Sequence, residues 1–88
     1  MPYYLYLLEC SNGAYYAGYT TNMERRFQEH QKGTAKCKYT RSFPPKRIAA
    51  CWVIHESLSR VLTLERYLKQ LSAAEKRKLI SAPDTLLI

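Results

Sequence analysis

Two short aromatic segments separated by an Asn-Gly pair constrain the fold of this chain more than any other feature. Residues 3–9 and 14–19 are rich in tyrosine and aliphatic residues, and Asn12-Gly13 lies between them. Because Asn-Gly tolerates the positive φ values of a type I′ turn, the pattern predicts a β-hairpin. Strand alternation then places the tyrosines on both faces of the hairpin, with Tyr4 and Tyr6 sharing one face.

A helix is predicted directly after the hairpin. Thr21 and Glu24 have the spacing of a capping box, and the helix is expected to run to about Lys32 and to end at Gly33. Residues 34–47 contain no regular pattern and are predicted to form a long basic loop.

The second half of the chain predicts one strand and two helices. Residues 48–54 form an apolar run, which we expect to be a third strand at the centre of the sheet. Residues 59–71 have apolar side chains at helical spacing, and Ser72 and Glu75 form a second capping box that opens a helix through about Ile80. The predicted fold class is α+β, a three-stranded antiparallel sheet flanked by helices in the order β-β-α-β-α-α.

Length and composition fit one small domain. The chain has 88 residues, of which 47% are hydrophobic, so we assign residues 1–82 to one domain and residues 83–88 to an apolar tail that folds back or binds a protein partner. Cys10, Cys37 and Cys51 lack CxxC spacing, so reduced thiols are expected rather than a structural zinc site. Neither a signal peptide nor a membrane span is recognisable, so we expect a soluble, cytoplasmic protein.

Most of the net charge of +7 comes from one region. Residues 24–47 hold eight basic and two acidic side chains. Such a block attracts a polyanion, although charge alone fits a solvated surface loop equally well. The residues predicted to contact nucleic acid are Lys32, Lys36, Lys38, Tyr39, Arg41, Lys46 and Arg47.

Glu65 stands out because it falls inside the apolar arc of its predicted helix. A carboxylate in that position needs a cation, a hydrogen-bond donor or a cleft. Two explanations stay open: a salt bridge to Arg26 or another basic residue, and ligation of a hard divalent cation.

Arg26 and His30 share one face of the first predicted helix, four residues apart. A planar guanidinium suits bidentate contact with phosphate. His30 is either a base, an orienting group or an ordinary surface histidine. On the second strand, Gly18 is expected to leave room beside Tyr16 for a ligand backbone.

These elements, taken in order, resemble the GIY-YIG nuclease superfamily and in particular its small stand-alone bacterial members. Tyr4-Leu5-Tyr6 stands where the family has Gly-Ile-Tyr, and Tyr16-Ala17-Gly18 stands for Tyr-Ile-Gly. Arg26 follows Tyr16 by the family's spacing of ten residues. The resemblance covers residues 3 to about 80.

The resemblance implies a phosphodiesterase whose catalytic residues are Tyr6, Tyr16, Arg26, His30 and Glu65. Glu65 would hold Mg²⁺ or Mn²⁺, and Arg26 would stabilise the pentacovalent phosphate. Tyr16 would be the general base or pass a proton, assisted by Tyr6 and His30. Because a phenol has a pKa near 10, Tyr16 is expected to need the positive charge of the metal and of Arg26 to lower it.

Two departures accompany the resemblance. Tyr4 replaces the first glycine of the motif, and Arg77 stands where several relatives have an asparagine.

We predict a metal-dependent endonuclease acting on DNA, with single-stranded or branched DNA favoured because Tyr39 and Phe43 offer stacking surfaces. RNA stays open as a substrate. The alternative is a non-catalytic nucleic-acid-binding or repair-partner module on the same fold.

Overall fold

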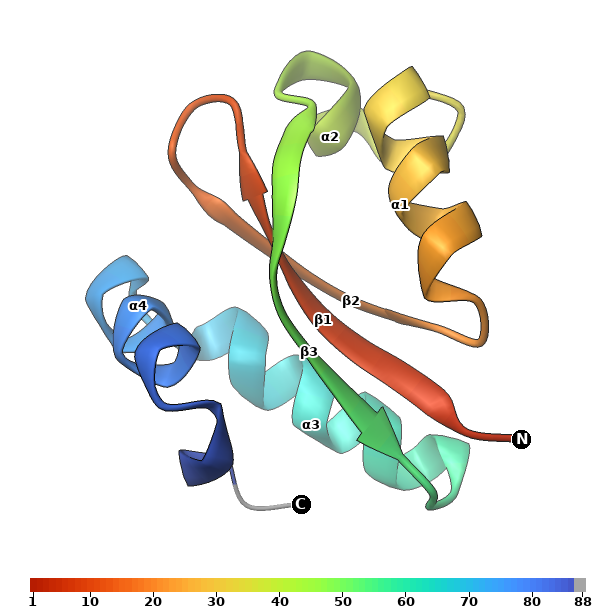
Figure 1. Ribbon diagram of the computed structural model, residues 1–88, viewed down its shortest axis with the longest axis vertical. Helices are drawn as coiled ribbons and strands as arrows, with labels where there is room; N and C mark the ends of the chain where they lie inside the picture. The colour runs from red at the N-terminus through yellow and green to blue at the C-terminus, as the bar shows by residue number, and fades with distance from the viewer. Residues whose placement is uncertain (87–88) are drawn as a thin grey trace.

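The computed structural model describes residues 1–86, so the last two residues of the apolar tail lie outside the described part of the chain. The elements follow one another as β1 (Tyr3–Cys10), β2 (Tyr15–Thr20), α1 (Met23–Lys32), α2 (Lys38–Ser42), β3 (Pro45–Ile54), α3 (Leu58–Gln70), α4 (Ala73–Ser81) and the 3₁₀ turn η1 (Pro83–Thr85) (Figure 1). This order confirms the predicted α+β fold, with the short helix α2 added.

The three strands form an antiparallel sheet in the order β2-β1-β3. The prediction that residues 48–54 form the central strand is therefore wrong, because β1 is central and β3 is an edge strand. The burial patterns show why. Residues 5–8 of β1 are consecutively buried, none more than 2% exposed, whereas β3 alternates and leaves Cys51 and Val53 exposed. A strand covered on both faces needs a continuous apolar run.

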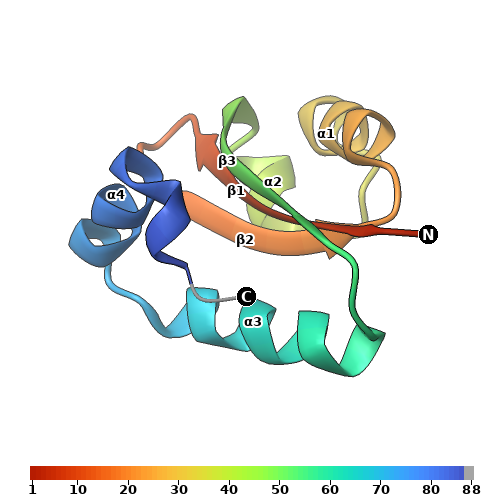
Figure 2. The ribbon, with the colours of Figure 1, turned by 60° about the horizontal axis from the view of Figure 1, so that its bottom comes forward.

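Helices cover both faces of the sheet (Figure 2). α1 and α2 lie on one side of the sheet and α3 lies across the other, while α4 lies beside one end of the sheet. The main core lies between the sheet and α3, α4 and the tail, and consists of Leu5, Leu7, Ala17, Ala50, Trp52, Ile54, Val61, Leu64, Leu68, Leu79 and Leu86. The indole Nε1 of Trp52 donates to the carbonyl oxygen of Pro83 at 3.0 Å. The described start of the tail thus folds back on the core.

The hairpin forms as predicted, but with a different turn. Gly13 has φ +84°, and none of the described non-glycine residues has positive φ. The Gly13 N–H donates to the carbonyl oxygen of Cys10 at 2.9 Å, and the Cys10 N–H donates to that of Ala14 at 2.8 Å. The type I′ prediction is therefore wrong: one left-handed glycine closes a three-residue connection, so Asn12 does not need the strained conformation.

Two of the three predicted helix signals are confirmed. Gly33 ends α1 with φ +75°, and Ser72 and Glu75 form the capping box of α4. The predicted capping box at Thr21 is wrong, because α1 starts one residue later with Asn22 as its N-cap. An asparagine oxygen accepts from the N3 amide as effectively as a threonine hydroxyl does.

Residues 34–47 are only partly the loop that the sequence predicts. They contain α2, which is too short to show helical periodicity, and the first residues of β3. α2 packs near α1 and carries the fully buried Thr40. Over residues 1–86, every helix falls short of the length and apolar character that a membrane span requires.

Candidate active site

A polar pocket of about 360 Å³ lies at the edge strand β2, with walls from β1, β2, α1, α3 and the segment before α2. We call it the active-site pocket. All five residues predicted as catalytic line it: Tyr6, Tyr16, Arg26, His30 and Glu65. The sheet and the two helices thus bring together side chains that are far apart in the sequence.

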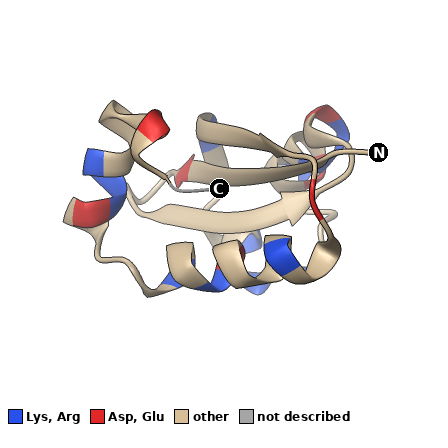
Figure 3. Ribbon diagram, turned by 90° about the horizontal axis from the view of Figure 1, so that it is seen from below, with Lys and Arg blue, Asp and Glu red and all other residues tan. Residues whose placement is uncertain are grey.

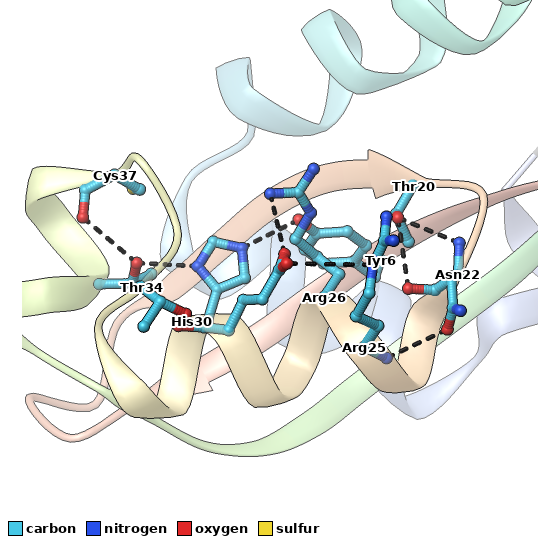
Figure 4. Close-up of polar contacts among 10 residues, drawn as sticks. Tyr6, Thr20, Asn22, Arg25, Arg26, His30, Thr34 and Cys37 are labelled. Atoms are coloured by element: carbon cyan, nitrogen blue, oxygen red, sulfur yellow. Dashed lines mark hydrogen bonds and ion pairs between the residues drawn. The ribbon is translucent and has the colours of Figure 1, made fainter.

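His30 is buried at the base of this pocket, only 2% exposed, with both ring nitrogens in hydrogen bonds. Nδ1 lies 2.8 Å from the hydroxyl of Thr40, which itself donates to the carbonyl oxygen of Cys37 at 3.4 Å. Because the Thr40 hydroxyl donates to Cys37, we assign the imidazole proton to Nδ1. Nε2 then accepts from the hydroxyl of Tyr6 at 3.2 Å (Figure 4). His30 therefore orients Tyr6.

This network holds His30 neutral. Burial lowers the pKa of His30 below its ordinary value of 6.5, and the positive charge of Arg26 lowers it further, against the weaker opposing effect of Glu29. Protonation would put a hydrogen on Nε2 and break the bond from Tyr6. With Tyr6 as the donor, this hydrogen bond therefore needs the neutral imidazole.

We expect the free energy of unfolding to fall as the pH drops below 6.5, the ordinary pKa of histidine. The unfolded chain takes up a proton on His30 before the folded chain does, so acid favours unfolding until the lowered folded pKa is passed. Thermal unfolding between about pH 5 and 7.5 measures this. The exposed His55 provides the matched control: His55→Gln should keep the dependence and His30→Gln should lose it. Equal profiles for the two variants would contradict the assignment.

The two pocket tyrosines are harder to ionise than free tyrosine. Burial raises the pKa of Tyr6 to about 12, outweighing the lowering effect of Arg26. The pKa of Tyr16 is raised from 10 as well, first by burial and then by its hydrogen bond with the Cys37 thiol. The expectation that neighbouring positive charge lowers the Tyr16 pKa is therefore not met by the protein alone. Both groups are neutral phenols at physiological pH.

Gly18 makes room for Tyr6 rather than for the predicted ligand beside Tyr16. The strand register pairs Gly18 with Tyr6, whereas Tyr16 pairs with Leu8. A Cβ atom on Gly18 would lie 2.6 Å from Cζ of Tyr6. The glycine thus lets the phenol lie flat across β2 toward His30.

Arg26 and Glu65 lie in the pocket, and each forms a loose ion pair. Nη1 of Arg26 is 3.5 Å from Glu29 Oε1, and the side chain of Arg26 remains 37% exposed. Oε2 of Glu65 is 3.7 Å from Nζ of Lys69, and the Glu65 side chain is 18% exposed. Of the two explanations left open for Glu65, a salt bridge exists, with Lys69 instead of Arg26. At that distance the pair binds weakly and leaves the carboxylate at the pocket wall.

The pocket fits a divalent metal only with help from a substrate. No three His, Cys, Asp or Glu side chains gather into a metal site anywhere in residues 1–86. A single carboxylate is nevertheless a sufficient protein contribution for Mg²⁺, which keeps several waters and takes oxygens from a bound phosphate. Glu65 is the residue whose position and chemistry fit this role.

The predicted nucleic-acid contacts divide into two groups. Lys36 lines the active-site pocket, and the ring of Tyr39 stacks near that of Tyr16, with centroids 6.3 Å apart. The others are exposed and do not line the pocket: Lys32, Lys38, Arg41, Lys46 and Arg47. Arg47 is on β3, at the opposite edge of the sheet from β2, and forms an ion pair with Glu9 at 2.6 Å.

Sequence reasoning missed three residues that shape the site. Thr40 and Cys37 fix His30 and Tyr16, and nothing in their sequence context signals a contact with residues so distant along the chain. Burial opposes ionisation of Cys37, but hydrogen bonds from the Tyr16 hydroxyl and from Thr40 outweigh it and lower the pKa of the thiol. Lys69 lies four residues after Glu65, a spacing that does predict an ion pair on a helix.

The fold and pocket together define a small α+β domain with a phenol, imidazole, guanidinium and carboxylate site at one sheet edge. Residues 2–78 match the family described as the GIY-YIG catalytic domain. The chain belongs to the GIY-YIG family, as the resemblance of its motifs predicts.

Small proteins with similar sequences match nearly the whole length of this chain. A UPF0213 protein of Syntrophus aciditrophicus is 44% identical over 77 residues, covering 88% of this chain and 87% of the relative. The UPF0213 protein BH0048 of Halalkalibacterium halodurans is 40% identical over 81 residues, covering 92% and 84%. The solution NMR structure of UPF0213 protein BH0048 from Bacillus halodurans matches with a TM-score of 0.58 at 38% identity, over 92% of this chain and 84% of that one.

Proposed function

We propose that this protein is a divalent-metal-dependent endonuclease that hydrolyses phosphodiester bonds in DNA. The observation that carries the proposal is that Tyr6, Tyr16, Arg26, His30 and Glu65 line one polar pocket. A surface that only binds nucleic acid has no need for a buried, neutral imidazole that fixes a phenol. Membership of the GIY-YIG family supports nuclease chemistry.

In the proposed reaction the scissile phosphate occupies the active-site pocket. The guanidinium of Arg26 stabilises the charge that accumulates on the phosphate oxygens as water attacks phosphorus. Glu65 would hold Mg²⁺ or Mn²⁺, which supplies Lewis-acid stabilisation at the leaving 3′ oxygen. Because Tyr16 remains a neutral phenol, we assign it to orienting the attacking water. Its oxygen takes the proton of the water as the phenol releases its own proton to solvent, and the leaving 3′ oxygen is protonated from solvent. Tyr6, fixed by His30, supports that side of the pocket.

The test is a cleavage screen of labelled single-stranded, duplex and branched DNA, and of single-stranded RNA, with Mg²⁺, Mn²⁺ or EDTA. We expect cutting that needs the metal, favours single-stranded or branched DNA and weakens as salt rises, because the basic surface binds phosphates. Salt-sensitive binding without cutting under every metal condition would contradict the nuclease proposal and support the alternative of a non-catalytic binding module.

A further inference from the structure

A second cavity of about 330 Å³ lies beside the active-site pocket and shares Tyr16 with it. We call it the β2 groove. Its walls are Tyr15, Tyr16, Ala17, Tyr39, Lys69 and Lys76. The groove therefore extends from the pocket along β2 toward α4, on the side away from the start of α1. A chain-like ligand that places one group in the active-site pocket can therefore continue into the β2 groove.

Tyr39 gives the β2 groove a fixed but exposed aromatic wall, and Phe43 lies beside Tyr39 without lining the groove. The Tyr39 ring is nearly parallel to that of Tyr16, at 15°, and its centroid is 5.3 Å from that of Phe43. The Tyr39 hydroxyl accepts from the side-chain amide of Asn12 at 2.9 Å. Tyr39 and Phe43 are nevertheless 37% and 39% exposed. Rings held in place before binding lose little conformational entropy when a flat ligand stacks on them.

The groove lining is also basic. Lys69 on α3 and Lys76 on α4 line the groove, and none of its described lining residues is acidic. Figure 3 shows that basic residues continue along both helices. Nζ of the half-buried Lys76 donates a long hydrogen bond of 3.4 Å to the carbonyl oxygen of Tyr15. Its ammonium has three donors, so it keeps capacity for an anionic ligand.

We propose that the β2 groove binds the nucleotides next to the scissile phosphate of a single strand, with a base stacked on the Tyr39–Phe43 surface and a backbone phosphate at Lys76. The proposal rests on the proposed function, because Tyr16 connects the groove to the reacting phosphate. Aromatic surface together with lysines is the combination that binds single-stranded nucleic acid. A paired base has no free face for stacking, so the groove selects unpaired DNA.

The test measures binding of the full chain to two fluorescent oligomers of equal length, oligo(dT) and an abasic backbone, by anisotropy in EDTA. Tyr39→Leu removes the stacking face but keeps apolar volume, and should weaken oligo(dT) binding about 5- to 100-fold with little effect on the abasic oligomer. Tyr39→Phe should stay within about twofold of the native chain, because the ring remains. Lys76→Gln should weaken binding of both oligomers and reduce the slope of log K against log salt by about 0.7.

Matched controls are Tyr67→Leu, a tyrosine 52% exposed that lies outside the groove, and Lys78→Gln, an exposed lysine on the same helix as Lys76. The proposal is overturned if Tyr39→Leu and Lys76→Gln bind both oligomers as these controls do. If Tyr39→Leu does not fold, Lys76→Gln on α4 decides alone. If the protein cleaves DNA but the groove variants bind as the controls do, only the groove proposal is refuted. If the groove variants weaken binding as expected but the protein cuts nothing with Mg²⁺ or Mn²⁺, only the nuclease proposal is refuted.

Discussion

Arg26→Ala is expected to reduce the single-turnover rate of DNA cleavage by about 10²- to 10³-fold, while DNA affinity changes only a few-fold. Arg26 lines the active-site pocket, and among residues 1–86 its guanidinium has one ion pair, a 3.5 Å contact with Glu29. It is therefore available for charge that develops in the transition state, where a fixed donor has its largest effect. Quench-flow cleavage with saturating enzyme measures the chemical step directly.

Arg25 is the comparison that tests the assignment. Arg25 also lines the active-site pocket, but its side chain is 66% exposed and pairs with the same glutamate at 3.9 Å. Arg25→Ala should cost about tenfold or less, mainly through binding, because an exposed arginine contributes to general attraction of phosphate. Arg26→Lys should recover only part of the activity, because lysine lacks the planar fork. A larger loss for Arg25→Ala than for Arg26→Ala would show that the wrong arginine has been assigned.

Gly18→Ala is expected to abolish most cleavage and to lower the free energy of unfolding by about 1–3 kcal/mol. The added methyl would approach Cζ of Tyr6 to 2.6 Å, and the ring cannot move away without losing its hydrogen bond to His30. Urea unfolding gives the stability change, and cleavage of the same samples gives the activity.

The clash with Tyr6 can be isolated with a double variant. In Gly18→Ala combined with Tyr6→Leu, the destabilisation should be smaller than the sum of the two single changes, because the atom that clashes is gone. Activity should stay low, since the phenol is missing. Strictly additive stability losses, or a fully active Gly18→Ala, would show that Tyr6 is not positioned by close approach to β2.

Local signals predicted most of the elements but not their arrangement. Gly33 and the Ser72 capping box act within one turn of backbone, and both are confirmed. The central position of β1 depends on helices that cover it from both sides, which no window of sequence shows. α2 was missed for a related reason: its five residues are held by packing of Thr40 against His30 rather than by helical periodicity.

The candidate site shows the same division. Motif spacing and family resemblance predicted five of the residues that line it, and the place of Glu65 in an apolar arc also indicated that residue. Their electrostatics could not be predicted, because the raised pKa values of Tyr6 and Tyr16 come first from burial in the folded chain. Likewise, the role of Gly18 depends on which residue of β1 lies opposite it.

The most direct test of the central claim compares Glu65→Gln with Glu56→Gln, an equal change of charge at an exposed position before α3. Single-turnover cleavage of labelled single-stranded DNA is measured in Mn²⁺, and affinity is measured in EDTA. We expect Glu65→Gln to cut at least about 10³-fold more slowly, because metal stabilisation of the transition state is worth several kcal/mol, and to bind DNA at least as tightly as the native chain. Glu56→Gln should cut normally. Native rates of metal-dependent cleavage by Glu65→Gln would contradict the account.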